Sequence, residues 1–70
     1  MVRISTGYKD RTGKLIFDDH ILENSRGVPF QVMIHKGEWV VFDEEGNVPF
    51  TLEEMLSGEE VEIVGIVTYS

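Results

Sequence analysis

Short apolar stretches alternate with turn-forming residues along the whole sequence. Glycine-containing breaks recur at short intervals, and the stretches between them hold four to nine residues rich in Val, Ile and Phe. Short strands at this spacing are typical of an all-β sandwich or barrel rather than of alternating helices and strands. The pattern therefore predicts a mainly β fold.

The middle of the chain predicts a β-hairpin. In residues 28–35 apolar side chains occupy every second position, which is the period of a strand with one buried face. Lys36-Gly37 is a two-residue turn signal, because glycine adopts a positive φ without strain. Residues 38–43 (EWVVFD) return with four consecutive apolar positions. Such a run suits a strand covered on both faces, or one that exposes Trp39 at a contact surface.

Residues 51–56 (TLEEML) predict one short helix. Thr51 is a candidate N-cap, and Glu54 three residues later completes a capping box. Gly58 is expected to end the helix. A helix of one or two turns is not stable alone in water, so we expect its apolar side chains to pack on the sheet and to close one end of a barrel.

The two ends of the chain supply the remaining strands. A last strand over Val61–Tyr69 changes face around Gly65, and a glycine inside a strand indicates a bulge or a sharp bend. Near the amino end we expect strands over 2–5, 14–17 and 20–23. Together these elements predict a partly open barrel of about five strands with one short helix, in a single domain covering residues 1–70.

Charge is distributed unevenly along the sequence. Residues 1–35 carry five Lys/Arg and four Asp/Glu, whereas residues 36–70 carry only Lys36 against nine acidic residues, so the halves have net charges of +1 and −8. The total of −7 does not favour nucleic-acid binding, since affinity for phosphate depends on Lys and Arg. The acidic half is interpreted as a solubilising surface, or as a face that meets a basic partner or imitates DNA.

Composition excludes several classes of site. The chain has no Cys and only two His, fifteen positions apart, so we expect no disulfide, no metal site and no cofactor. No apolar run approaches the 18 residues or so of a membrane span, and Met1-Val2-Arg3 does not lead into a signal sequence. These features predict a cytoplasmic protein that does not bind membranes.

Five polar residues near the amino end (Lys9, Asp10, Asp18, Asp19 and His20) raise the question of catalysis. Adjacent residues of an extended strand point to alternate faces, so the three at positions 18–20 do not converge. Residues 9–14 are typical of a turn in which Asp10 accepts downstream backbone N–H groups and Gly13 has a positive φ. The sequence therefore predicts no enzyme, with no catalytic, cofactor-binding or metal-binding residue.

Two segments carry a family resemblance. Residues 6–17 (TGYKDRTGKLIF), continuing to Ile21-Leu22, resemble the opening motif of the YopX-like family, small proteins of bacteriophages and of prophages in Gram-positive bacteria. Residues 63–67 (IVGIV) resemble the closing Val-x-Gly-x-hydrophobic strand of that family, while Asp19-His20 stand where the family usually has Gly-Asp. The resemblance implies an SH3-like barrel and a phage or prophage origin, hence the cytoplasm of a bacterial host. It supplies no activity and no site residues.

The predicted function is that of a non-enzymatic accessory protein that binds a host or phage protein. Aromatic anchors dominate the energetics of protein interfaces, and the exposed acidic turn after residue 43 could contribute charge. The candidate contact residues are Trp39, Val41, Tyr69, Glu44 and Glu45.

Three alternatives stay open. An acidic DNA mimic or host-factor inhibitor would need one continuous face formed by Glu44, Glu45, Glu53, Glu54, Glu59, Glu60 and Glu62. A weak nucleic-acid-binding barrel would use Lys9, Arg11, Lys14 and Arg26. Self-association as a homo-oligomer would pair the edge strands of an incompletely closed barrel.

Overall fold

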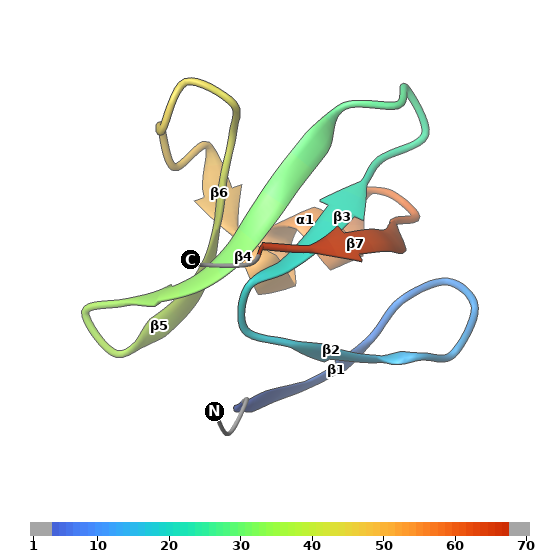
Figure 1. The fold of residues 1–70 in the computed structure, drawn as a ribbon, viewed down its shortest axis with the longest axis horizontal. Helices are drawn as coiled ribbons and strands as arrows, with labels where there is room; N and C mark the ends of the chain where they lie inside the picture. Colours follow the sequence, from blue (N-terminus) through green and yellow to red (C-terminus); the bar gives the residue numbers. More distant parts are fainter. Residues whose placement is uncertain (1–3, 68–70) are drawn as a thin grey trace.

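Seven β-strands and one short helix make up residues 4–67, the part of the chain that the computed structural model describes. They follow one another as β1 (Ser5–Lys9), β2 (Leu15–Phe17), β3 (His20–Glu23), β4 (Pro29–His35), β5 (Glu38–Phe42), β6 (Phe50–Thr51), α1 (Leu52–Gly58) and β7 (Glu62–Ile66). The antiparallel sheet has the order β6-β5-β4-β3-β7, and β1 and β2 form a separate hairpin (Figure 1). The predicted mainly β fold with one short helix is confirmed, but this part of the chain forms no closed barrel, because β6 and β7 remain at opposite edges of the sheet.

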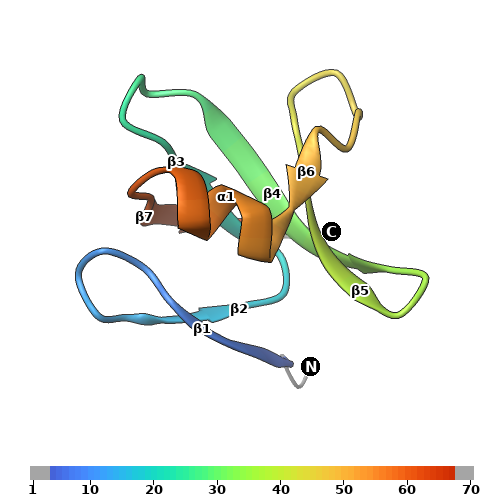
Figure 2. The same cartoon turned by 180° about the vertical axis from the view of Figure 1, so that it is seen from behind.

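The core lies between the inner face of the sheet, the helix and the β1–β2 hairpin. Figure 2 shows α1 in front of the sheet and the hairpin below it. Almost every element contributes at least one side chain, which ties the hairpin and the helix to the sheet through apolar burial. The most deeply buried side chains are Ile16, Leu22, Val32, Val41, Leu52, Met55 and Val61.

The central hairpin forms as predicted. Strands β4 and β5 pair His35 with Glu38 across the turn. Lys36 and Gly37 have φ values of 52° and 80°, the two left-handed residues that a tight hairpin turn requires. Alternation along β4 places Val32 in the core, whereas Ile34 is 53% exposed because the hairpin extends beyond the core at this end.

Strand β5 explains the run of four apolar residues. Val40 pairs with Met33 on the outer face of the sheet, and Val41 pairs with Val32 on the inner face. Both are buried, with 4% and 0% of their surface exposed. The interpretation of a strand covered on both faces is therefore confirmed, and Trp39 is half-buried against the core.

The helix begins and ends as predicted, but its carboxyl-terminal cap differs from the expected one. The Glu54 N–H donates to the Thr51 hydroxyl at 3.2 Å and the Thr51 N–H donates to Glu54 Oε1 at 2.9 Å, which completes the capping box. The helix ends at Gly58 as predicted, but without a left-handed glycine cap: Glu59 caps it in an extended conformation and donates its N–H to the Met55 carbonyl. A chain that leaves in an extended conformation needs no left-handed glycine. The helix packs against β5 and β6 on the inner face. Within residues 4–67, no helix has the length and apolar character needed to cross a membrane.

The outermost strands show where local patterns were insufficient. The bulge beside Gly65 is confirmed, because Ile21 pairs with Gly65 and Leu22 with Ile63, which leaves Val64 as the extra residue. The strand over Val61–Tyr69 is shorter than predicted, and Tyr69 lies outside the described residues.

The prediction of a first strand over 2–5 placed its end wrongly, since β1 begins at Ser5 and continues to Lys9; residues 2 and 3 lie outside the described part. Gly7 has φ 82° and looks like a break. The Thr6 hydroxyl donates to the Ile16 carbonyl and accepts a hydrogen bond from the Tyr8 N–H, which spans Gly7. The strand therefore continues past the glycine.

Candidate functional site

Residues 4–67 contain three hairpin loops of identical construction: Asp10–Lys14, Asn24–Val28 and Asp43–Asn47. In each loop the first residue donates its N–H to the carbonyl of the fifth, and the glycine at position four donates back to the first. The side-chain Oδ1 of the first residue accepts the N–H groups of the third and fifth residues at 2.9 to 3.0 Å. The glycines have φ values of 78° to 88°. A short Asp/Asn-x-x-Gly-x sequence therefore builds a fixed backbone and leaves positions two and three available for other roles.

The second and third loops share one end of the five-stranded sheet. Strands β3 and β5 run in the same direction because each is antiparallel to β4 between them, so their loops project from the same edge of the sheet (Figure 1). The β1–β2 loop lies apart from the third loop and meets only the second, where Arg11 lines a depression with Asn24 and Ser25 (Figure 1). We call the surface formed by residues 24–28 and 43–47 the loop end. Loops on a rigid scaffold are a common place for binding residues.

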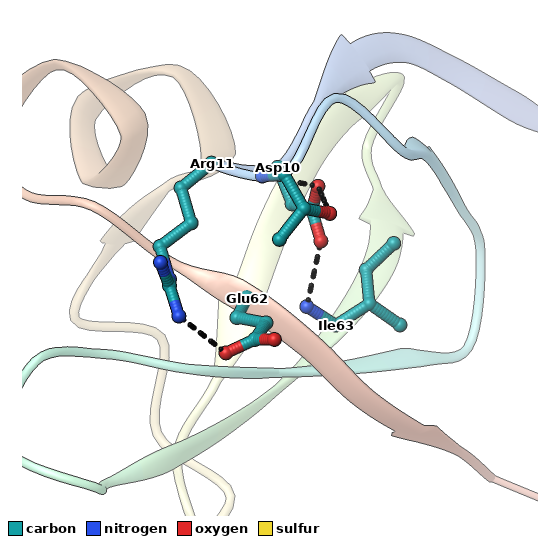
Figure 3. Close-up of polar contacts among 5 residues, drawn as sticks. Asp10, Arg11, Glu62 and Ile63 are labelled. Atoms are coloured by element: carbon teal, nitrogen blue, oxygen red, sulfur yellow. Dashed lines mark hydrogen bonds and ion pairs between the residues drawn. The ribbon is translucent and has the colours of Figure 1, made fainter.

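Asp10 fastens the first loop to β7. Its Oδ1 accepts the Thr12 hydroxyl at 2.7 Å in addition to the two loop N–H groups, and its Oδ2 accepts the Ile63 N–H at 3.0 Å. Beside it, Arg11 donates its N–H to the Val61 carbonyl, and its guanidinium pairs with Glu62 at 2.9 Å (Figure 3). A local turn and a long-range strand contact thus share one carboxylate.

The ionisation of Asp10 follows from this geometry. Burial raises the pKa of the carboxyl group, which is only 6% exposed. The hydrogen bonds from the Thr12 hydroxyl and from the N–H groups of Ile63, Lys14 and Thr12 more than offset burial, and they lower the pKa from 3.8 to about 2. Asp10 is therefore ionised at neutral pH with both oxygens occupied. Its role in the structure is that of the turn residue that the sequence predicts.

The other polar residues of the amino end lie at a second corner. Asp18 accepts the Ile4 N–H at 2.8 Å, the Phe17 N–H donates to His20 Nδ1 at 3.0 Å, and Asp19 has φ 63° where the chain passes from β2 to β3. This corner and Asp10 lie at opposite ends of the β1–β2 hairpin, about 13 Å apart at the rise of a strand. The structure therefore does not bring the five polar residues together. Across the described residues, no group of three or more His, Cys, Asp or Glu side chains could hold a metal ion.

The candidate contact residues are divided in the same way. Trp39 lines a small pocket of about 190 Å³ with Tyr8 and Glu53, near the start of β5. Glu44 and Glu45 occupy positions two and three of the third loop, past the other end of β5 and roughly 15 Å away. Both are exposed. The tryptophan and the two glutamates therefore belong to different surfaces.

Val41 was wrongly predicted as a contact residue. Its side chain is fully buried in the core cluster that includes the apolar residues of α1, so it offers no surface to a partner. The four-residue apolar run suggested exposure at one of its positions, but both central valines are covered. Tyr69 lies outside the described residues.

An apolar groove at the loop end was not predicted from the sequence. Two neighbouring depressions of about 270 and about 330 Å³ flank the third loop and share Phe30, Asp43 and Glu44. Apolar side chains from both flanks of this loop and from the second loop form most of the lining. The groove is defined by Ile21, Val28, Pro29, Phe30, Gln31, Phe42, Asp43, Glu44, Glu45, Pro49, Phe50 and Val67. The sequence feature that could have indicated the groove is the presence of apolar residues directly beside turns, namely Val28 and Pro49-Phe50.

Among the described residues, those that line the groove carry negative charge and no positive charge. Asp43, Glu44 and Glu45 are acidic, and the lining among the described residues contains no Lys or Arg. The single basic residue of the acidic half, Lys36, lies in the β4–β5 turn at the opposite end of β5. The groove therefore combines an apolar floor with a negative rim.

The remaining glutamates lie elsewhere. Glu53 lines the pocket beside Trp39. Glu60 and Glu62 line the depression beside Arg11, whose guanidinium forms an ion pair with Glu62. These two depressions share no lining residue with each other, and neither shares one with the groove. The single continuous acidic face that a DNA mimic requires gains no support from this division.

No protein-family model, curated protein or solved structure matches this chain. The resemblance to the YopX-like family, and the SH3-like barrel that it implies, therefore stay predictions. The fold and the site define a small, mainly β protein that has three rigid loops. At one end it carries an apolar groove with an acidic rim.

Proposed function

We propose that this protein is a non-enzymatic protein-binding module that contacts its partner through the apolar groove. The observation that carries the proposal is the groove itself, an apolar floor bordered by exposed charge on a fixed loop. Protein interfaces combine an apolar centre with a polar rim, and an exposed apolar surface on a small domain is a common mark of an interaction site.

The non-enzymatic part of the proposal rests on the polar residues. Asp10 already accepts four hydrogen bonds, and Asp18 and His20 bond to backbone N–H groups at the far end of the hairpin. General acid–base catalysis needs titratable groups that converge on one bond. In these positions the side chains stabilise loops and corners instead.

We further propose that the chain is a YopX-like accessory protein of phage or prophage origin that acts in the cytoplasm of a bacterial host. Support comes from the motif residues: Thr6 and Gly7 shape β1, and Asp10 and Gly13 shape the first loop. Because these motif residues determine turns and strands, the motif specifies the fold and does not fix which residues contact a partner.

Affinity capture from a Gram-positive bacterial lysate tests the binding proposal when it includes two matched variants. Val28→Gln removes an apolar side chain that lines the groove and is 38% exposed, and its backbone bonds to Asn24 do not involve the side chain. Ile34→Gln makes the same kind of change at an exposed position at the far end of β4. Thermal melting verifies that both variants fold.

We expect one partner to be captured by the wild type and by Ile34→Gln, and about tenfold less by Val28→Gln, because losing one buried apolar side chain costs about 1.5 kcal/mol of binding. Equal capture by all three proteins, or capture of no partner, would refute the assignment of the groove as the contact surface.

A further inference from the structure

The structure points to a partner of defined chemistry, and this inference rests on the proposed function. We infer that the groove receives an extended basic peptide segment of another protein. One or two apolar side chains of the segment would lie on the floor of the groove, and its Lys or Arg side chains would lie beside Glu44 and Glu45.

The shape of the groove favours a peptide over a small molecule. Its two depressions share Phe30, Asp43 and Glu44 and meet at the base of the third loop; Ile21, Gln31 and Phe42 line one on the outer face of the sheet, and Val28, Pro49 and Phe50 line the other on the side of the core. Each depression is shallow and near the lower limit of about 300 Å³ for small-ligand pockets. Two shallow apolar depressions that meet at the third loop match two side-chain anchors of an extended chain that crosses this end of the sheet.

The charge of the rim selects the sign of the partner. Asp43 uses Oδ1 to hold the loop but keeps its negative charge, and no ion pair in residues 4–67 involves Glu44 or Glu45. An acidic peptide or a nucleic acid would be repelled, whereas Lys or Arg would be attracted during encounter and held in register. The net charge of −7 for the whole chain extends the same preference to long range.

Rigidity of the third loop adds to the fit. The bonds from Glu45 and Asn47 to Asp43, together with Gly46 at φ 83°, fix the backbone before any partner arrives. Binding to a prepared loop avoids the cost of ordering it. The two glutamates are thus presented at a constant spacing to the side chains of the peptide.

A second copy of this chain is a less suitable occupant. In the five-stranded sheet that carries the groove, edge strand β6 has two residues and edge strand β7 is interrupted by the bulge at Val64, so the edges of this sheet are poorly suited to strand pairing between copies. The partner is therefore sought outside the protein.

Selection from a random peptide library displayed on a carrier, with the intact protein immobilised, tests the inference. We expect enriched peptides to combine at least two Lys or Arg with one or two large apolar residues. The most enriched sequence is then synthesised with a fluorescent label and titrated with wild-type protein at about 50 mM and about 300 mM salt, where screening of surface charges differs strongly. Binding should weaken at the higher salt.

Two charge-reversal variants with the same net change locate the effect. We expect Glu44→Lys/Glu45→Lys to weaken binding of the labelled peptide by about tenfold or more. Glu38→Lys/Glu53→Lys, beside Trp39 and near the opposite end of β5, should change it less than about twofold because these side chains line no part of the groove or of its loops. The neutral pair Glu44→Gln/Glu45→Gln should have an intermediate effect and serves as the second variant if charge reversal disturbs folding.

The outcomes separate this inference from the proposed function. Enriched peptides that lack positive charge and still depend on Val28 would overturn the basic partner and leave the groove as a binding surface. Equal weakening by both reversal variants would also overturn it. Absence of any enriched peptide would overturn this inference. The proposed function would then be decided by whether capture of a partner from lysate depends on Val28.

Discussion

Replacing Asp10 by Asn removes a charge and one acceptor while keeping the size of the side chain. In the wild type both oxygens accept hydrogen bonds, from Thr12 and Lys14 on Oδ1 and from Ile63 on Oδ2. An Asn amide has only one acceptor oxygen, so its NH₂ group must face a donor, either in the loop or on β7. The variant should therefore loosen the contact between the first loop and the sheet.

The expected loss follows from the pKa of Asp10. The difference between 3.8 and about 2 is about 1.8, and at about 1.4 kcal/mol for each pKa unit it corresponds to about 2.5 kcal/mol of folding free energy. Because the pKa is lower in the folded chain than in the unfolded one, this stabilisation is fully present above about pH 4. It is lost as the pH falls through about 2.

Urea unfolding followed by the fluorescence of Trp39, the only tryptophan in the chain, measures the effect. We expect Asp10→Asn to lower the free energy of unfolding by about 2 to 3 kcal/mol at pH 7, and the difference from the wild type to disappear toward pH 2. Asp43→Asn is the matched control, since Asp43 makes the same loop bonds without a contact to β7. Its cost should stay below about 0.5 kcal/mol, because Asn24 already serves this role in the second loop.

Equal losses for Asp10→Asn and Asp43→Asn would show that the bond to the Ile63 N–H contributes nothing beyond the turn. A loss at Asp10 that is unchanged at pH 2 would show that the charge is not its source. Either result would refute the reasoning that ties the first loop to β7 through one carboxylate.

Two further predictions concern single elements of the fold and use the same unfolding assay. Gly46→Ala should lower the free energy of unfolding by about 1 to 2 kcal/mol, because alanine is strained at φ 83° even though a Cβ would meet no neighbour there. Gly65→Ala is the control: its position is equally open and has no positive φ, so the change should leave stability unchanged or raise it slightly. Similar losses at both glycines would contradict this account. Thr51→Ala should lower the free energy of unfolding by about 1 kcal/mol by removing the capping box of α1, while Thr51→Ser should retain most of that stabilisation. A Thr51→Ala variant as stable as the wild type would mean that tertiary packing alone holds the helix.

Features specified by neighbouring residues could be predicted from the sequence, and features made by distant segments could not. The β4–β5 turn at Lys36-Gly37 and the capping box at Thr51 each depend on a few consecutive residues, and both form as expected. The bond from Asp10 to Ile63 joins residues 53 positions apart, and no local pattern encodes it. For the same reason the sequence predicted a barrel instead of an open sheet, since the edges of the sheet are set by long-range strand pairing.

The candidate site illustrates that limit. Glu44 and Glu45 were expected at an exposed turn and are found there, because a turn between strands is a local property. The groove beside them was missed because its floor combines Val28 and Phe30 with Pro49 and Phe50, segments that the pairing of β4 with β5 and of β5 with β6 brings together. Val41 was misassigned because burial on two faces cannot be distinguished from exposure by an apolar run alone.

The repeated loop construction has a consequence for how recognition could diversify. In the second and third loops the framework is made by the Asn or Asp, the glycine and the backbone, and the side chains of Ser25, Arg26, Glu44 and Glu45 take no part in it. Substitutions at these four positions could therefore redirect specificity with little penalty to folding, much as hypervariable loops do on an immunoglobulin framework. The first loop lacks this freedom, since Thr12 and Arg11 are engaged in holding it to β7 and its flank.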